Sequence, residues 1–314
     1  MIVTLTPNPG IDRTVSVDVL HHGEVNRATA SRIDPGGKGV NVSRALTAQG
    51  GDTLAVLPLG GPEGILMGQL LTDAGVAYEG VKVSGTLRMN VAVVEPDGTT
   101  TKVNEPGPLL SADDVARLCK AVEITAATAD WVVGCGSLPP GAPTNLFADL
   151  VARARARGVK VAIDSSGAPM AAAMSARPDL VKPNHEELEE VVGRALPTLG
   201  DVVDAAQELV TAGTGTVVVS LGGDGAVLVT ADRVAHAVAT VTDPQSTVGA
   251  GDCLLAGLLH ALSRGDDPAD ALATGVAWGA AAVGLPGSRV PSPADVARIR
   301  VSLDHHPDLT RLIA

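Results

Sequence analysis

The chain has 314 residues, of which 45% are hydrophobic, 18% are charged and only 1% are aromatic. This length and composition exclude an intrinsically disordered chain and allow one large α/β domain or two small ones. The net charge of −12, the lack of any basic run and the scarcity of rings on which bases could stack exclude nucleic acid as a partner.

Short β-rich runs alternate with Ala- and Leu-rich amphipathic stretches along the chain. The predicted buried strands are residues 53–57, 129–133, 159–163 and 216–220. The predicted helices are residues 38–50, 62–74, 111–127, 143–157, 200–212, 250–264 and 268–283. This alternation is typical of βαβ units, so the sequence predicts an α/β protein with a mostly parallel central sheet covered by helices on both faces.

Two segments, residues 12–34 and 86–104, interrupt that alternation. Both alternate apolar with polar side chains, as a half-buried antiparallel ribbon does, and Glu95-Pro-Asp-Gly98 has the chemistry of a hairpin turn. Their pattern fits a small sheet that lies over a cleft as a lid, and it fits an ordinary edge hairpin equally well. There is no internal repeat or low-complexity linker, and we therefore expect a single domain over residues 1–314.

Cysteine usage and the N-terminus indicate where the protein resides. Cys119, Cys135 and Cys253 have neither the CxxC spacing of a zinc site nor a disulfide framework, which favours the reduced cytosol. The first residues, MIVTLTPNPG, lack the basic and apolar regions of a signal peptide, and no apolar run reaches the ~18 residues of a membrane span. We expect a cytoplasmic protein without membrane contact.

The first candidate site is the segment Pro35-Gly-Gly-Lys-Gly-Val-Asn41, just before a predicted helix. Glycines such as Gly37 allow the backbone to approach a ligand, and Lys38 and Asn41 offer a cation and an amide near the helix N-terminus. The pattern favours an anion or polyol site, and a tight turn is an equally good interpretation. The spacing is not that of a Walker loop.

The second candidate is Ser246-Thr-Val-Gly-Ala-Gly-Asp252, which opens another predicted helix. Its turn of small residues, Gly249, Ala250 and Gly251, would present free N–H groups and the positive end of the helix dipole to a transferring phosphoryl group. Asp252 lies in the first helical turn, where helix capping is the commoner role of an aspartate.

Two further loops follow predicted strands. In Lys182-Pro-Asn184-His-Glu-Glu187, Asn184 and Glu187 share a helical face and could hold Mg²⁺ through its waters, although a capping box is the simpler interpretation. Residues 220–225, Ser-Leu-Gly-Gly-Asp-Gly, fit either nucleotide contact or a simple hairpin. Residues 134–139 begin like a dinucleotide fingerprint but carry proline in place of its third glycine.

The order of these loops is more specific than any one of them. They are GGKGVN near residue 40, RMN at 88, GSLPPG at 136, DSSG at 164, VKPNHEEL at 181, SLGGDG at 220 and STVGAGD at 246. From end to end this order resembles the PfkB (ribokinase-like) carbohydrate kinases. The resemblance implies a ribokinase-like three-layer α/β/α fold, with a single kinase domain over residues 1–314 and a small β-sheet lid built from 12–34 and 86–104. Because one face of a small sheet is costly to leave uncovered, we expect a homodimer through the lid.

The resemblance also implies roles for single residues. It makes Asp252 the general base, beside an anion hole formed by Gly249, Ala250 and Gly251. The residues implied to bind the sugar phosphate are Asp12, Gly37, Lys38, Asn41, Arg88, Asn90 and Ser137. The residues implied to bind the nucleotide are Lys182, Asn184, Ser220, Gly222, Gly223, Gly225 and Gly251, with Glu187 holding Mg²⁺ through water.

The start TLTPNPGID, the GGKGVN loop and KPN-x-x-EL resemble the branch of the family that phosphorylates ketohexose phosphates. The expected reaction is ATP- and Mg²⁺-dependent conversion of fructose 1-phosphate to fructose 1,6-bisphosphate, with tagatose 6-phosphate and fructose 6-phosphate as alternative substrates. A nucleoside or vitamin kinase and a non-catalytic sugar-phosphate-binding regulator are alternative functions. Lys38 and Arg88, two cations in an acidic chain, favour a phosphorylated substrate. Ser246 stands where K⁺-binding ribokinases have a carboxylate, which weakens the case for a monovalent-cation site.

Overall fold

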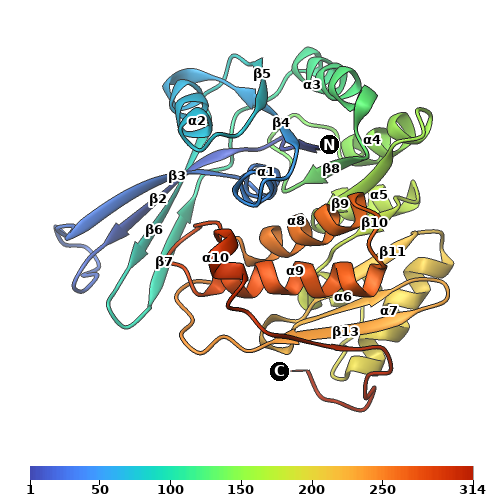
Figure 1. Cartoon of the computed structure of the whole chain (residues 1–314). Coiled ribbons are helices and arrows are strands. Elements are labelled where there is room, and N and C mark those ends of the chain that lie inside the picture. The colour runs from blue at the N-terminus through green and yellow to red at the C-terminus, as the bar shows by residue number, and fades with distance from the viewer. Residues whose placement is uncertain (314) are drawn as a thin grey trace.

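A ten-stranded sheet forms the centre of the molecule, in the strand order β14-β13-β12-β11-β10-β9-β8-β1-β4-β5 (Figure 1). The structure is a computed structural model that describes residues 1–313. The strands are β1 (Ile2–Leu5), β4 (Thr53–Leu59), β5 (Tyr78–Lys82), β8 (Trp131–Cys135), β9 (Lys160–Asp164), β10 (Leu180–Val181), β11 (Thr216–Ser220), β12 (Ala226–Val229), β13 (Val234–Ala239) and β14 (Val301–Asp304). All pairs from β5 to β11 are parallel, and β12, β13 and β14 extend the sheet by antiparallel pairing.

Helices cover both faces of this sheet. One face carries α3 (Ala112–Thr125), α4 (Leu146–Arg155), α5 (Gly167–Ser175), α6 (His185–Val192) and α7 (Leu199–Thr211). The other carries α1 (Lys38–Ala48), α2 (Gly61–Asp73), α8 (Ala250–Ser263) and α9 (Pro268–Val283). The short elements are η1 (Ala126–Thr128), η2 (Gly222–Asp224) and α10 (Pro293–Val296). Fully buried Phe147 and Leu255 show how aliphatic residues and a single phenylalanine fill the two helical layers.

The predicted alternation of strands and helices is confirmed, with each predicted element within three residues of its observed bounds. The sequence patterns did not reveal α5, whose residues Gly167–Ser175 are apolar nearly all round and therefore show no amphipathic period. Nor did they reveal β1 inside the sheet, or β5, β13 and β14 toward its two edges. Among residues 1–313, no helix is both long and apolar enough to cross a lipid bilayer.

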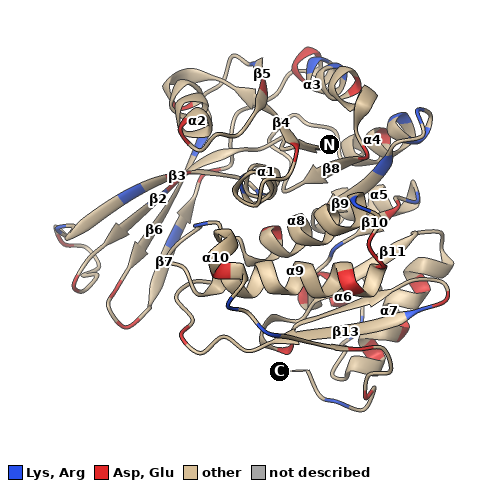
Figure 2. Cartoon of the chain, viewed as in Figure 1, with Lys and Arg blue, Asp and Glu red and all other residues tan. Residues whose placement is uncertain are grey.

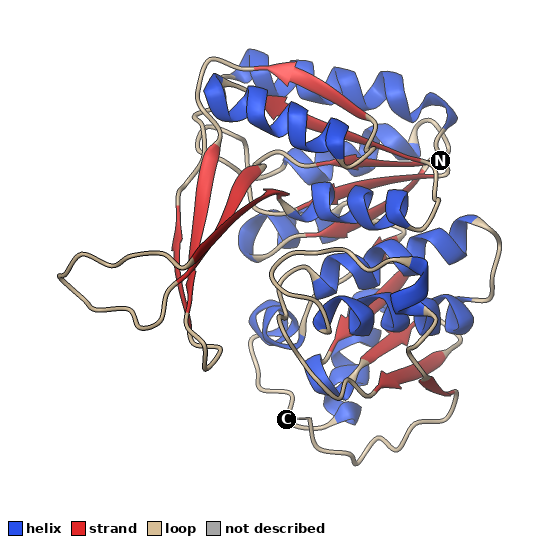
Figure 3. Ribbon diagram, turned by 60° about the vertical axis from the view of Figure 1, so that its left-hand side comes forward, coloured by secondary structure: helices blue, strands red, loops and turns tan. Residues whose placement is uncertain are grey.

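The two segments that break the alternation form a separate four-stranded sheet, which projects from the layered body in Figure 3. Its strands are β2 (Gly10–Ser16), β3 (Ala30–Gly36), β6 (Arg88–Val94) and β7 (Thr100–Asn104), in the order β3-β2-β6-β7. The expected antiparallel ribbons are present as β2–β3 and β6–β7, the latter closed by a turn in which Gly98 N donates to Glu95 O at 3.0 Å. A parallel β2–β6 pairing joins them. The interpretation as a hairpin at the edge of the main sheet is therefore wrong.

Candidate active site

The candidate residues gather where the carboxyl ends of the parallel strands meet the helix N-termini. The strand order reverses at β1, because β4 lies on one side of it and β8 on the other. Ligands of open α/β sheets bind at such a switch point. The loops after β1 and β8 meet there, since Asn8 Nδ2 donates to Ser137 Oγ at 3.2 Å. The sequence-predicted Ser137 thus lies at this switch point.

Asp252 lies in the first turn of α8, as predicted, and its carboxylate is directed to another helix. The helix begins after Gly249, whose φ of +78° explains the glycine, and no side chain caps the helix there. The Asp252 carboxylate does not act as that cap. Its Oδ2 accepts a hydrogen bond from Asn41 Nδ2 of α1 at 2.8 Å. A Cβ on Gly251 would lie 3.4 Å from Lys182 Nζ, so this turn runs close to the loop after β10.

A cluster of alternating charges, buried at Asp164 and Lys182 and partly exposed at Lys38, lies beside Asp252. Asp164, at the end of β9, is fully buried and pairs with Lys38 Nζ at 2.6 Å and Lys182 Nζ at 3.1 Å. Lys38 Nζ is also 3.7 Å from Glu187 Oε1. These residues come from β9, α1, the β10–α6 loop and α6. The structure therefore brings together Lys38, Lys182 and Glu187, which the sequence assigned to different ligands.

The cluster sets the protonation of Asp252. Burial and the nearby charge of Asp164 raise the pKa of Asp252 to about 6, against the lowering effects of Lys38, Asn41 and Lys182. Asp164 is buried as well, but Lys182 and Lys38 keep its pKa below the usual range. Its partners likewise raise the pKa of Lys38 despite burial. Asp252 is thus the carboxylate whose pKa lies near neutral pH, as a general base requires.

The lid strands supply a second polar group. Asp12 on β2 faces Asn90 on β6 across the parallel pairing, and Asn90 Nδ2 donates to Asp12 Oδ1 at 2.9 Å. Burial raises the pKa of Asp12. Arg88 Nη2 donates to Asn8 O at 3.0 Å, and the buried Arg88 Nε has no partner. At Gly36 a Cβ would lie 2.3 Å from Asp12 Oδ2, so only glycine leaves space for this carboxylate.

The GGKGVN loop packs closely against the residues that follow β1. Gly37 has φ +112°, and a Cβ there would lie 2.8 Å from Thr6 Cγ2. Both the turn and the close approach therefore require glycine. Lys38 and Arg88 do not share a partner among the described contacts: the first is paired with carboxylates and the second with a backbone carbonyl.

At the two loops that the sequence predicted to bind the nucleotide, the structure contains both of the simpler alternatives, a capping box and a hairpin. Asn184 Oδ1 accepts from Glu187 N at 2.7 Å and Glu187 Oε2 accepts from Asn184 N at 2.9 Å, which is a complete capping box. Ser220 N donates to Pro183 O at 3.1 Å, which joins this loop to the β11–β12 hairpin. The glycines of that hairpin have different surroundings.

Gly225 has a packing reason, because a Cβ would lie 2.0 Å from Ala237 O. Gly222 and Gly223 face open space, with no atom within 4 Å of an added Cβ. The φ of +58° accounts for glycine at position 222, so only Gly223 lacks a structural reason and is left as a position where the backbone could approach a ligand.

Comparison with known proteins identifies the scaffold. The profile described as "pfkB family carbohydrate kinase" matches residues 8–295. The chain belongs to this family. It is 38% identical over 300 residues to 1-phosphofructokinase of Rhodobacter capsulatus, covering 95% of each chain, and 36% identical over 302 residues to ATP-dependent 6-phosphofructokinase isozyme 2 of Escherichia coli, covering 95% of this chain and 97% of the other. The crystal structure of phosphofructokinase-2 from Escherichia coli with substrates and products superposes with a TM-score of 0.90 at 34% identity, covering 95% and 97% of the two chains.

This membership establishes an enzyme that transfers a phosphoryl group to a sugar, on a ribokinase-like fold with a large sheet and a small separate one. Two buried residues of the candidate site, Asp164 and Arg44, received no role from the sequence. Asp164 could have been predicted as a site residue, because it is the first residue of DSSG and comes at the end of a buried strand. Arg44 could not, because an arginine inside an amphipathic helix normally faces solvent.

The charge distribution of this pfkB protein limits where an anionic ligand can bind. Acidic residues are spread over many elements in Figure 2, in keeping with the net charge of −12. An anionic ligand therefore meets a repulsive average field, and it binds only where local donors outweigh that field.

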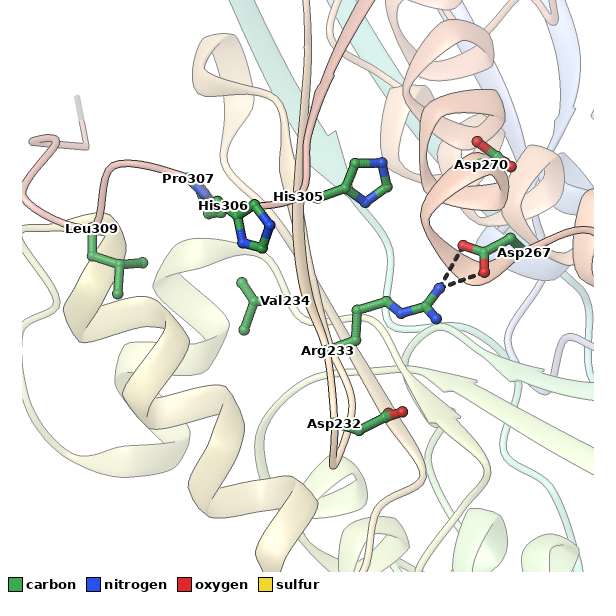
Figure 4. A pocket seen from close by; sticks show the side chains of 9 residues that line it. All are labelled: Asp232, Arg233, Val234, Asp267, Asp270, His305, His306, Pro307 and Leu309. Atoms are coloured by element: carbon green, nitrogen blue, oxygen red, sulfur yellow. Dashed lines mark hydrogen bonds and ion pairs between the residues drawn. The ribbon is translucent and has the colours of Figure 1, made fainter.

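A hollow of about 740 Å³ lies at the other end of the strands, between the β12–β13 turn, the start of α9 and the C-terminal segment (Figure 4). Arg233 there pairs with Asp267 at 2.5 Å. None of the lining residues belongs to the candidate site, and β12 runs away from Gly225 toward this hollow. It is therefore not the place of phosphoryl transfer.

Proposed function

We propose that the protein is a cytoplasmic ATP-dependent kinase of ketohexose phosphates that converts fructose 1-phosphate to fructose 1,6-bisphosphate. The observation that carries the mechanism is the buried carboxylate of Asp252 at the N-terminus of α8, held by Asn41 and with a pKa of about 6. The substrate assignment is supported by relatives named 1-phosphofructokinase in Rhodobacter capsulatus and Haloferax volcanii, at 38% and 39% identity.

In the proposed reaction Asp252 accepts the proton of the sugar C6 hydroxyl. The C6 oxygen attacks the γ-phosphorus of ATP, and the bond from that phosphorus to the oxygen bridging the β-phosphate breaks, which releases ADP. In this proposal the N–H groups of Gly249 and Gly251 at the start of α8 stabilise the developing negative charge, whereas the Ala250 N–H already donates to Thr247 O at 3.3 Å. Transfer in line between oxygen atoms needs positioning and charge stabilisation more than covalent catalysis.

We assign the sugar to the cleft between the lid strands and α1. Asp12 and Asn90 are placed to bind hydroxyl groups, and the unpartnered Nε of Arg88 is a donor for the phosphate already on the sugar. Asn41 and the Gly37–Lys38 turn line the side of the proposed sugar site formed by α1. Because Lys38 is engaged with Asp164 and Glu187, we assign it a supporting electrostatic role at the junction of the two ligands.

ATP is assigned to Lys182, Asn184 and the Ser220–Gly223 turn. Among residues 1–313 no group of three or more His, Cys, Asp or Glu side chains could hold a metal ion. A single carboxylate, that of Glu187, fits Mg²⁺, because this ion takes few protein ligands and keeps water and substrate phosphates in its coordination shell. Glu187 would hold the ion through water. When bound, Mg²⁺ neutralises phosphate charge.

We further propose that the lid, residues 12–34 and 86–104 of the single kinase domain, excludes water and joins two copies of the chain. The support is its exposed outer strand, where Val103 of β7 is 61% accessible. A structure of phosphofructokinase-2 from Escherichia coli is described as a tetrameric inhibited form. Sedimentation at micromolar concentration tests this proposal, and a monomer would remove the dimer.

The second candidate substrate is fructose 6-phosphate, because the Escherichia coli relative at 36% identity is named a 6-phosphofructokinase. Steady-state assays with fructose 1-phosphate, fructose 6-phosphate, tagatose 6-phosphate and unphosphorylated fructose decide the matter. We expect the largest kcat/KM with fructose 1-phosphate. Equal activity on fructose would overturn the sugar-phosphate assignment, and no activity on any of them would overturn the proposed function.

A further inference from the structure

Arg44 of α1 is a buried arginine that converges on carbonyl oxygens from three parts of the chain. Only 7% of its side chain is exposed. Its Nη1 donates to Pro35 O at 3.1 Å, to Asn41 Oδ1 at 3.0 Å and to Ser288 O at 3.1 Å, and its Nη2 lies 3.7 Å from Asp34 Oδ1. Asp34 and Pro35 belong to lid strand β3, and Ser288 to the segment after α9.

The contact with Asn41 decides which way that amide points. An amide side chain has an acceptor at one end and donors at the other, and the two ends have nearly the same shape. Arg44 offers only donors, so it selects the orientation in which Oδ1 faces the guanidinium. The donor end, Nδ2, then faces Asp252 Oδ2 at 2.8 Å. In the opposite orientation an oxygen would face the ionised carboxylate and repel it.

We propose that Arg44 is a positioning residue for phosphoryl transfer, which fixes the Asn41 amide and through it the direction of the Asp252 carboxylate. This inference rests on the proposed role of Asp252 as general base. Because the same guanidinium also binds the lid strand and the segment after α9, the alignment of the base depends on how these two segments are seated against α1.

Other titratable groups face the two ends of this chain of contacts. Around Arg44 they are Asp34, Asp12, Arg32 and the neutral thiol of Cys253. Around Asp252 they are Asp164, Lys38, Lys182 and the neutral thiols of Cys135 and Cys253. The substitution Arg44→Lys keeps the positive charge, but its side chain is one bond too short to reach the carbonyl oxygens that Nη1 binds. A change of activity in Arg44→Lys therefore reports the loss of the hydrogen bonds of Arg44 and not the loss of its positive charge.

The test is a double-mutant cycle that combines Arg44→Lys with Asn41→Ala. We expect each single variant to lower kcat roughly 10- to 100-fold, since a small misplacement of a reacting group has costs of this order. Each should also move the acidic limb of kcat upward by about one pH unit, because Asp252 loses a donor that favours its charged form. If Arg44 acts through Asn41, the double variant resembles Asn41→Ala alone.

Gln49→Met is the matched control. Gln49 Nε2 donates to Pro291 O at 2.8 Å, and so it ties α1 to the same C-terminal segment without touching Asn41. We expect near wild-type kcat and an unchanged pH profile for this variant. If Arg44→Lys does not fold, Arg44→Gln replaces it, because it removes the long side chain without leaving a buried charge.

Additive effects in the cycle, an unchanged acidic limb in the Arg44 variant, or the same loss in Gln49→Met would each overturn the positioning role. The proposed function fails separately, if the wild-type enzyme phosphorylates none of the sugar phosphates or if Asp252→Asn keeps a near-normal kcat. The two failures are therefore distinguishable in one series of assays.

Discussion

Asp252→Asn tests the proposed base, because it removes one charge with little change of shape. The amide oxygen of the new side chain can still accept the hydrogen bond from Asn41 Nδ2, which is 2.8 Å from the carboxylate in the wild type. The new side chain cannot take up a proton from the sugar hydroxyl. We expect kcat to fall by ~10²–10⁴ and the KM for ATP to change little, as for the loss of a general base.

The same substitution should make the protein more stable. Burial and Asp164 raise the pKa of Asp252 from 3.8 to about 6, so the ionised carboxylate destabilises the folded state. A shift of about two pH units corresponds to roughly 3 kcal/mol. Below pH 4 the aspartate is protonated in both folded and unfolded chains, and the variant gains nothing. The gain grows between pH 4 and 6, reaches about half at pH 5 and is constant above pH 6.

Urea unfolding at pH 5.0 and pH 7.5, together with kcat, measures both effects. Asp204→Asn is the control, because Asp204 is an exposed residue of α7 and its substitution changes the net charge by the same amount. A near-normal kcat would refute the base. A variant that is less stable than wild type at pH 7.5 would refute the argument that the buried charge is costly.

Four other substitutions test separate parts of the site and fold. Arg88→Lys should raise the KM for fructose 1-phosphate about tenfold and leave that for ATP, because an ammonium cannot grip phosphate with two parallel N–H bonds; steady-state kinetics checks this. Glu187→Gln should raise the Mg²⁺ concentration needed for half-maximal rate severalfold, in a Mg²⁺ titration at fixed ATP. Gly225→Ala should lower the free energy of unfolding by more than ~2 kcal/mol, since φ is +85° and the new Cβ would lie 2.0 Å from Ala237 O. Val103→Asp should convert a lid dimer to monomers in sedimentation.

The order of the loops could be read from the sequence, but their pairing could not. Lys38 and Asp164 are 126 residues apart, and nothing near either residue shows that their charges meet at 2.6 Å. Lys38 therefore looked like a cation free to bind phosphate. Asp252 was easier to single out, because it directly follows a turn of small residues at a helix start, although helix capping is the commoner role of an aspartate there.

The lid shows the same limit at the level of strands. Alternating polarity revealed the two ribbons, because the alternation of apolar and polar residues can be seen in one strand without knowing which strand pairs with it. It contained no sign of the parallel β2–β6 pairing that brings Asp12 opposite Asn90. Arg44 was invisible for a related reason, because its acceptors are backbone and amide oxygens that sequence patterns do not mark.

The two phosphate-binding regions of the proposed site differ in how their cations are already engaged. Lys182 on the proposed nucleotide side and Lys38 at the junction of the two ligands have ammonium groups that face the carboxylates of Asp164, Asp252 and Glu187. The chain by itself therefore offers ATP phosphates no excess of positive charge. On the sugar side, Arg88 retains an unpartnered Nε. On the proposed assignment we therefore expect the protein to bind the phosphate of the sugar directly, and we expect ATP to need a divalent cation, because the charges of the protein on the nucleotide side are already balanced.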